Sequence, residues 1–158
     1  MPRRPALLPS VLIGVGLGGF IDGIVLHQIL QWHHMVSDEG CCPTSSLIGL
    51  EDNTFADGIF HAVTWLVTLI GTIVAVRAWQ RGELAPPWRA HIGGLFVGWG
   101  IFNLIDSLNH FVLGLHHIRD DLGGPVGWDI GFLVFAVALI AVGWGLIKTA
   151  GRPSGHPV

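Results

Sequence analysis

The chain has 158 residues, of which 51% are hydrophobic and only 12% are charged, and its formal net charge is −3. Its mean hydropathy is +0.60, which excludes an ordinary soluble domain, because such domains are about 25% charged. The sequence has no phosphate-binding loop, no nucleic-acid-binding motif and no Ser/His/Asp order, so we expect neither nucleic acid nor serine-hydrolase chemistry. We therefore expect an integral membrane protein whose main partner is the lipid bilayer.

Four apolar runs divide the chain, and each exceeds the roughly 20 residues that a helix needs to cross the core of a bilayer. They cover residues 7–35, 56–80, 90–118 and 127–149. The predicted fold is therefore all-α, an integral membrane four-helix bundle that forms one domain over residues 1–158. Because the first run has no small-residue cleavage site, we do not expect a cleavable signal peptide.

The basic residues predict the orientation of these spans. Seven of the 8 Lys and Arg residues lie at the N-terminus, between the second and third spans, or at the C-terminus, and only Arg119 lies elsewhere. An even number of spans places those three regions on one side of the membrane. The positive-inside rule then puts both termini in the cytoplasm and leaves segments 36–55 and 119–126 outside.

The end of the first span carries a polar pattern that recurs at the end of the third span. In both, a His is followed after five residues by a His-His doublet, and an Asp lies shortly before the first His. The residues are Asp22, His27, His33 and His34 in the first span, and Asp106, His110, His116 and His117 in the third. We therefore predict two parallel two-helix repeats, related by a pseudo-two-fold axis along the membrane normal.

Helical spacing selects among these residues if both spans stay helical to their ends. Positions three, four or seven apart share a face, which groups the first His of each span with the second member of its doublet, His34 or His117. The first members of the doublets, His33 and His116, fall about 100° away from that face. We therefore give His33 and His116 a secondary role.

The second span adds Asp57 and His61, whose i, i+4 spacing brings their side chains together. An ionisable residue inside a membrane costs about 2.5–3.5 kcal/mol and persists only with a partner or a function. We therefore predict a transition-metal site in the outer half of the bundle. Its predicted residues are His27, His34, His61, His110, His117, Asp57 and Asp106, with the carboxylates as ligands or as acceptors that orient the imidazoles.

The identity of the metal is predicted from the ligand types. Imidazole ligands suit copper, iron and zinc alike. Cys41 and Cys42 in the outer segment favour copper, because adjacent cysteines rarely bond to each other and free thiolates are soft ligands. A protein with such a site would serve in copper handling, oxidase assembly or oxidative chemistry. An enzyme built on it would be a metal-dependent oxidoreductase.

Three alternatives stay open at this point. The His residues could form polar contacts between helices without any metal. They could instead hold one b-type haem by bis-His ligation, for example between His27 and His110. In a third alternative, Asp22 and Asp106 lie near the middle of the membrane and titrate in a small proton- or ion-coupled transporter.

Three segments taken together resemble a known family. They are Gly18–His34, Asp57–His61 and Leu113–Asp120. Over residues 11–149 the chain is similar to small bacterial membrane proteins of unknown function. The resemblance implies a four-span protein of the bacterial cytoplasmic membrane and associates it with copper and with an oxidase-assembly partner. It implies no catalytic residue, and it leaves open whether the protein forms a homo-oligomer.

Overall fold

The computed structural model describes residues 6–37, 42–84 and 87–150. These residues form helices and connecting segments with no strand, which confirms the predicted all-α class. The elements are α1 (Leu8–Ile21), the π-helix η1 (Asp22–Ile29), α2 (Leu47–Gln80), α3 (Trp88–Leu108), the π-helix η2 (Asn109–Leu113), the 3₁₀-helix η3 (Asp120–Leu122) and α4 (Val126–Thr149). η1 continues α1 and η2 continues α3, so four long helical segments build the molecule.

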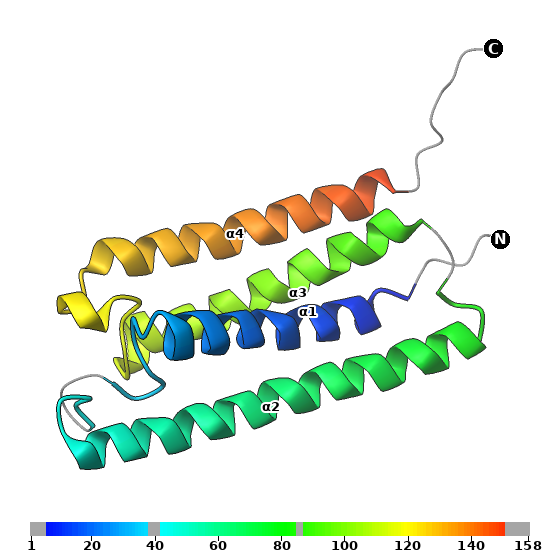
Figure 1. Ribbon diagram of the computed structural model, residues 1–158. Helices are drawn as coiled ribbons and strands as arrows, with labels where there is room; N and C mark the ends of the chain where they lie inside the picture. Colours follow the sequence, from blue (N-terminus) through cyan, green and yellow to red (C-terminus); the bar gives the residue numbers. More distant parts are fainter. Residues whose placement is uncertain (1–5, 38–41, 85–86, 151–158) are drawn as a thin grey trace.

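The four segments lie side by side in the order α2, α1, α3, α4 (Figure 1). α1 and α3 form the inner pair, while α2 packs on α1 and α4 packs on α3. α1 begins and α4 ends at the same end of the molecule (Figure 1). The segments that follow η1 and η2 meet at the opposite end, where the His-rich parts of the sequence come together.

Three helical segments are long and apolar enough to cross a membrane: Leu8–Ile29, Leu47–Gln80 and Val126–Thr149. α3 is not among them, although the sequence predicted a fourth span there. Its mean hydropathy is lowered by polar residues such as Asn103 and Asp106, both of which are buried. An inner helix with neighbours on both sides tolerates such residues, because its polar side chains face protein rather than lipid.

The predicted ends of the first and third spans are wrong by several residues. The first span was predicted to reach residue 35, but η1 ends at Ile29. The third was predicted to reach residue 118, but η2 ends at Leu113. In both cases the residue that turns the chain has a positive φ, 50° at Gln31 and 63° at Gly114. A left-handed residue of this kind commonly ends a helix.

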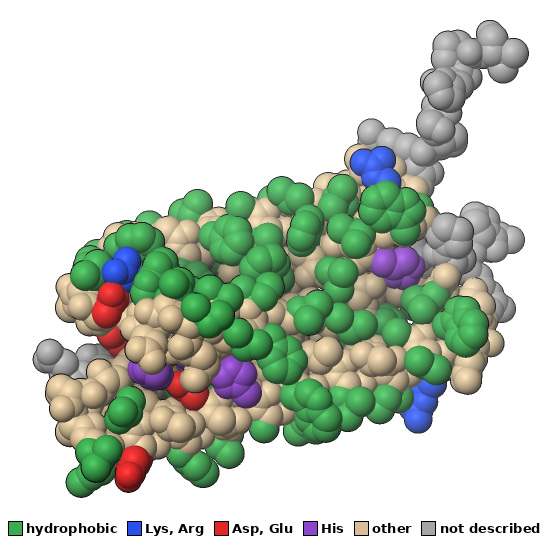
Figure 2. Space-filling view, in the orientation of Figure 1, with side chains coloured by type: hydrophobic (Ala, Val, Ile, Leu, Met, Phe, Trp, Pro, Cys, Tyr) green, Lys and Arg blue, Asp and Glu red, His purple; other side chains and the backbone are tan. Residues whose placement is uncertain are grey.

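The outward faces of α2 and α4 suit contact with lipid. Large hydrophobic side chains are exposed along both helices, for example Trp65, Ile70, Val134 and Val142. Figure 2 shows hydrophobic side chains across the middle of the visible face, with charged side chains gathered toward the two ends. This distribution is the one expected for a protein whose middle is surrounded by hydrocarbon.

Glycines bring the helix backbones into direct contact. A Cβ atom on Gly98 of α3 would overlap the carbonyl oxygen of Val11 in α1. A Cβ atom on Gly93 of α3 would lie 2.5 Å from the carbonyl oxygen of Gly143 in α4. Close approach through small residues is how helices associate in lipid, where burial of apolar side chains provides no driving force. These contacts fix the inner pair of helices that carries the polar residues.

Candidate metal centre

Four imidazoles and two carboxylates are buried together at the end of the bundle where η1 and η2 lie. Each imidazole is at most 3% exposed, and the carboxylates are 5% and 9% exposed. They form two groups, which we call the first triad (Asp22, His27 and His33) and the second triad (Asp106, His110 and His116). In each triad one potential ligand atom per residue lies within 4.8 Å of the other two.

The two triads meet through the first members of the His doublets. The rings of His33 and His116 stack with a centroid separation of 4.5 Å and an interplanar angle of 11°. His27 meets His33 edge-on at 4.6 Å, and His110 meets His116 edge-on at 4.9 Å. The same arrangement is therefore made twice, and the two copies touch along the His33–His116 stack.

The π-helix η1 explains how unequal spacings give the same contact. Asp22 precedes His27 by five residues, whereas Asp106 precedes His110 by four. A π-helix bonds residue i to residue i+5, so residues five apart lie close together on it. The Asp22 Oδ2 to His27 Nε2 distance is 3.1 Å, and the Asp106 Oδ2 to His110 Nε2 distance is 3.3 Å. The wider turn of the π-helix thus accommodates the one additional residue between Asp22 and His27.

The doublets reach the centre because the helices end before them. His33 Nδ1 lies 3.1 Å from the carbonyl oxygen of Ile118, and His116 Nδ1 lies 3.1 Å from that of Met35. Each ring therefore donates to the backbone carbonyl of the residue that directly follows the other doublet. The sequence-based choice against His33 and His116 assumed a helix through both doublets. That assumption fails, so the angle of 100° does not apply.

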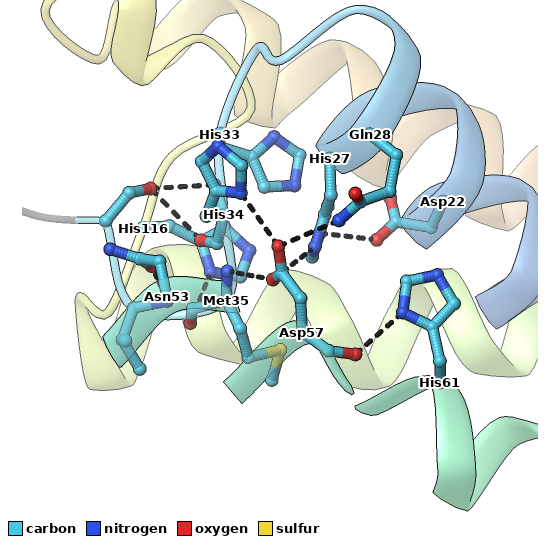
Figure 3. Close-up of polar contacts among 12 residues, drawn as sticks. Asp22, His27, Gln28, His33, His34, Met35, Asn53, Asp57, His61 and His116 are labelled. Atoms are coloured by element: carbon cyan, nitrogen blue, oxygen red, sulfur yellow. Dashed lines mark hydrogen bonds and ion pairs between the residues drawn. The ribbon is translucent and has the colours of Figure 1, made fainter. Parts of the chain in front are cut away.

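Asp57 is the acceptor that holds the first triad from outside (Figure 3). Its carboxylate lies 2.8 Å from His27 Nδ1 and 2.7 Å from His34 Nδ1. It also accepts from the Gln28 side chain at 3.2 Å and from the backbone N–H of Met35 at 2.9 Å. Four donors occupy the lone pairs of the carboxylate. Asp57 therefore orients His27 and His34, and His27 Nε2 is left facing Asp22.

Asp129 of α4 plays the matching part beside the second triad. Its carboxylate accepts from His117 Nδ1 at 2.8 Å and from the Ile118 N–H at 2.9 Å, and His110 Nδ1 lies 3.5 Å away. The sequence analysis did not include Asp129, because the rest of the fourth apolar run is nonpolar. A usable signal was present: Asp129 stands near the start of the fourth apolar run, 127–149, as Asp57 does in the second, 56–80.

Several buried polar atoms of the triads make no hydrogen bond among the described residues, although His27 Nε2 and His110 Nε2 each lie beside a carboxylate oxygen, at 3.1 Å and 3.3 Å. They are Asp22 Oδ1, His27 Nε2, His33 Nε2, Asp106 Oδ2 and both ring nitrogens of His110. Buried polar atoms are nearly always satisfied, so such a cluster requires an explanation. Imidazoles whose Nδ1 donates to an outer acceptor present Nε2 in the form that binds a metal. The donor set therefore fits a metal ion in each triad.

The other predicted site residues lie outside the two triads. His34 and His117 bind the outer acceptors Asp57 and Asp129. His61 Nδ1 lies 2.6 Å from the backbone oxygen of Asp57, one turn earlier in α2. Of the predicted set, the structure brings only His27, His110 and Asp106 into the triads.

The cysteines give no support to a thiolate ligand. Cys42 is 6% exposed and disulfide-bonded, so it carries no free thiolate here. Cys41 lies outside the described residues. The expectation that this loop supplies a soft sulfur ligand therefore fails for Cys42, and the two triads found among the described residues offer nitrogen and oxygen donors.

The chain is similar to known membrane proteins. The sequence profile of a family described as "Predicted membrane protein (DUF2243)" matches residues 9–150. The lipoprotein signal peptidases of Mycobacterium tuberculosis (strain ATCC 25618 / H37Rv) and Mycobacterium bovis (strain ATCC BAA-935 / AF2122/97) are each 32% identical over 129 residues, which is 80% of this chain. The match spans only 62% of the length of those relatives. No solved structure matches the chain. Because the profile covers nearly the whole sequence, the chain belongs to this family of predicted membrane proteins.

Proposed function

We propose that this membrane protein binds two transition-metal ions, one in each triad. The observation that carries the proposal is the convergence at the centre of buried imidazole nitrogens and carboxylate oxygens that make no hydrogen bond among the described residues. Leaving such groups without a partner inside a membrane protein is costly. A cation in the first triad would give His27 Nε2 and His33 Nε2 a partner, and a second cation would do the same for His110 Nε2 and Asp106 Oδ2.

The dimensions of the triads suit a metal ion. Imidazole nitrogen and carboxylate oxygen bind first-row metals at about 2.1 Å, so two ligands of one ion lie at most about 4.2 Å apart. The potential ligand atoms in each triad lie within 4.8 Å of one another. A shift of less than about 1 Å therefore brings them into range. Bound metal would supply Lewis-acid or redox chemistry, while Asp57 and Asp129 hold the imidazoles in place.

Copper is the ion we place first. Two imidazoles and one carboxylate accept Cu(II), Fe(II) and Zn(II), and the order of affinities for such donors peaks at Cu(II). The triads contain no sulfur, so this preference rests on affinity order and not on softness. Copper handling, oxidase assembly and oxidative chemistry are all consistent with a buried Cu(II) centre.

The decisive experiment compares the two members of one doublet. The protein is purified in detergent without chelator, and its metal content is measured by elemental analysis together with a visible spectrum. We expect two ions per chain in the wild type, about one in His33→Gln and two in His34→Gln. The variants differ only in which neighbour is changed, so general damage is controlled. No stoichiometric metal in the wild type, or loss in His34→Gln alone, overturns the proposal.

We also propose that the two halves of the chain are parallel repeats and that both termini are cytoplasmic. The paired contacts support the repeat: His33 and His116 each donate to the opposite segment, and Asp57 and Asp129 each accept from a doublet. The distribution of Lys and Arg supports the orientation. A bacterial cytoplasmic membrane is the location that follows.

The packing of the imidazoles argues against a bis-His haem. A porphyrin bound in this way lies between two imidazoles, one on each face. The His33 and His116 rings stack directly on each other at 4.5 Å, and His27 and His110 each pack edge-on against that stack. No plane between these rings is free for a porphyrin. A haem absorption band in the purified protein would contradict this conclusion.

A second candidate function is peptide-bond hydrolysis by Asp22 and Asp106. The two carboxylates come from different helices, and the chain is 32% identical to lipoprotein signal peptidases over 129 residues. Two carboxylates that share a proton form the machinery of aspartic proteases. Here, however, each carboxylate lies beside a His, at 3.1 Å and 3.3 Å, which favours metal binding.

The test of the second candidate uses a lipid-modified signal peptide as substrate. We expect no cleavage by wild-type protein in detergent. Cleavage that disappears in both Asp22→Asn and Asp106→Asn, and that survives chelator, would replace metal binding with hydrolysis as the function.

A further inference from the structure

We propose that a pocket beside the first triad binds an apolar molecule that carries a hydroxyl group, taken up from the lipid phase. The pocket has a volume of about 360 Å³, within the range of about 300–1,000 Å³ typical of small-molecule sites. It lies between η1, α3 and the first turns of α4. Its walls are mainly apolar and aromatic, with Leu26, Trp99, Phe132 and Phe135 among them.

The pocket opens toward the surface that we assign to lipid. Three of its lining residues, Val25, Trp128 and Phe135, are 36%, 45% and 45% exposed on the outside of the bundle. An apolar molecule dissolved in the membrane therefore reaches the pocket without crossing water.

Two polar residues, Asp22 and Asn103, interrupt the apolar wall, and each has one side-chain atom without a hydrogen-bond partner among the described residues. Asp22 Oδ1 and Asn103 Nδ2 are buried without a hydrogen bond, and their residues are 5% and 1% exposed. The carboxylate oxygen requires a donor and the amide nitrogen requires an acceptor. A hydroxyl group is both donor and acceptor, so it matches the requirement of each of these two atoms. A carboxylate ligand would be repelled by Asp22.

Two of the residues that line the pocket, Trp32 and Trp128, have their aromatic rings in contact. Trp32 and Trp128 meet at a centroid distance of 5.5 Å, and the Arg119 guanidinium lies 4.4 Å and 5.1 Å from their ring centroids. Cation–π contacts of this kind hold aromatic rings in place at a membrane interface.

Glycines on α4 leave the space that forms the pocket. Gly127 and Gly131 line it, and a Cβ atom added to either would meet nothing within 4 Å. Counting from Asp57 and Asp129, the corresponding residues of α2 are Phe55 and Ile59. In the first half of the chain, larger side chains therefore occupy the positions that are glycine beside the pocket. The sequence leaves room for such a pocket in the second half and not at the corresponding place in the first.

The experiment uses a bromine-terminated long-chain alcohol as the probe, with the same bromoalkane lacking the hydroxyl as its comparison. Bromine quenches tryptophan on contact, and Trp32, Trp99 and Trp128 all line the pocket. In phosphatidylcholine nanodiscs we expect saturable quenching by the alcohol, with an affinity about tenfold above that of the bromoalkane. Asn103→Leu should abolish this preference.

Matched variants locate the binding. Gly131→Leu should fill the pocket and remove the saturable quenching, while Gly145→Leu, on the same helix and equally free of contacts within 4 Å, should retain it. Unchanged quenching in Gly131→Leu, or equal affinity for the two probes, overturns the proposal. Competition by added phosphatidylglycerol would identify a lipid headgroup as the source of the hydroxyl, and lack of competition would identify a free membrane alcohol.

This proposal stands or falls separately from metal binding. Metal content measured on the same samples should be equal in wild type and Gly131→Leu, because Gly131 touches neither triad. Saturable quenching without metal would uphold the pocket and refute the metal centre, and the reverse result would uphold the centre and refute the pocket.

Discussion

The two triads share one plan but differ in how firmly they are held. In the first, His27 Nδ1 lies 2.8 Å from Asp57, a full hydrogen bond, whereas in the second, His110 Nδ1 lies 3.5 Å from Asp129. Both nitrogens of His110 lack a hydrogen bond among the described residues. The same types of side chain therefore form one triad whose first His is hydrogen-bonded to an outer carboxylate and one triad whose first His is not. We expect the first triad to bind metal more tightly.

The largest expected effect comes from removing the outer acceptors. Asp57→Ala removes the acceptor of four donors, among them the buried His27 Nδ1, and should lower the free energy of unfolding by about 3–5 kcal/mol. Asp129→Ala removes two short hydrogen bonds and should cost about 2–3 kcal/mol. Denaturation in detergent, followed by circular dichroism, measures both. Glu51→Ala, an exposed change on the same helix as Asp57, is the control. Equal costs at the two positions would contradict the difference between the triads.

The next prediction concerns metal affinity. Acceptors that orient a ligating His contribute about 10–100-fold to affinity, so Cu(II) titration should show two steps separated by at least about tenfold. His27→Gln should remove the tighter step and His110→Gln the weaker one. Isothermal calorimetry with a competing chelator resolves the two steps. A single step that both variants reduce equally would mean that the triads act as one site.

The sequence predicted the helices better than it predicted the centre. Helix content and the starts of α3 and α4 follow from apolar length. The ends of η1 and η2 do not, because nothing about Gln31 marks it as a left-handed residue. Gly114 was a usable signal, since glycine often follows the last turn of a helix.

Which His residues were predicted to be metal ligands depended on where the helices were expected to end. With the helices extended through the doublets, His34 and His117 appeared to face inward. Once the chain turns, His33 and His116 enter the centre instead. Asp22 stood in the motif but was assigned only to the transporter alternative, and its spacing of five to His27 did not indicate a contact in an α-helix. Periodicity alone cannot reveal a π-turn, whose geometry depends on the packing of the finished fold.

Exchanging the two turning residues should have opposite effects in the two halves. Gln31 adopts φ of 50° where the second half uses Gly114 at 63°. A left-handed conformation costs a residue other than glycine about 1–2 kcal/mol. Glycine avoids this cost but loses more conformational entropy on folding, which offsets part of the gain in stability. Gln31→Gly should therefore stabilise by about 0.5–1 kcal/mol, and Gly114→Gln should destabilise by about 1–2 kcal/mol. Thermal unfolding of both variants tests the sign, and a loss of stability in Gln31→Gly would show that its side chain is needed.

The smallest expected effect lies at the rim, where Arg119 and Asp121 of the second half form an ion pair. Arg119 follows Ile118, whereas Val36 follows Met35 at the matching place. Arg119 donates to Asp121 at 2.7 Å and 2.9 Å, and this hydrogen bonding holds the pKa of Asp121 below its ordinary value. A lowered pKa means that the pair stabilises the rim above the ordinary value of about 3.9 and loses this effect as the pH falls through the folded-state pKa.

Tryptophan fluorescence reports this pair, because Arg119 lies over Trp32 and Trp128. The difference in emission between wild type and Asp121→Asn should be constant from about pH 5 to pH 8 and should disappear only in stronger acid. The effect should be small and should shrink further in salt, because both side chains reach water at the rim and exposed pairs are screened. A change in that difference near neutral pH would instead assign the signal to the neighbouring His residues. It would then report on the centre and not on the rim.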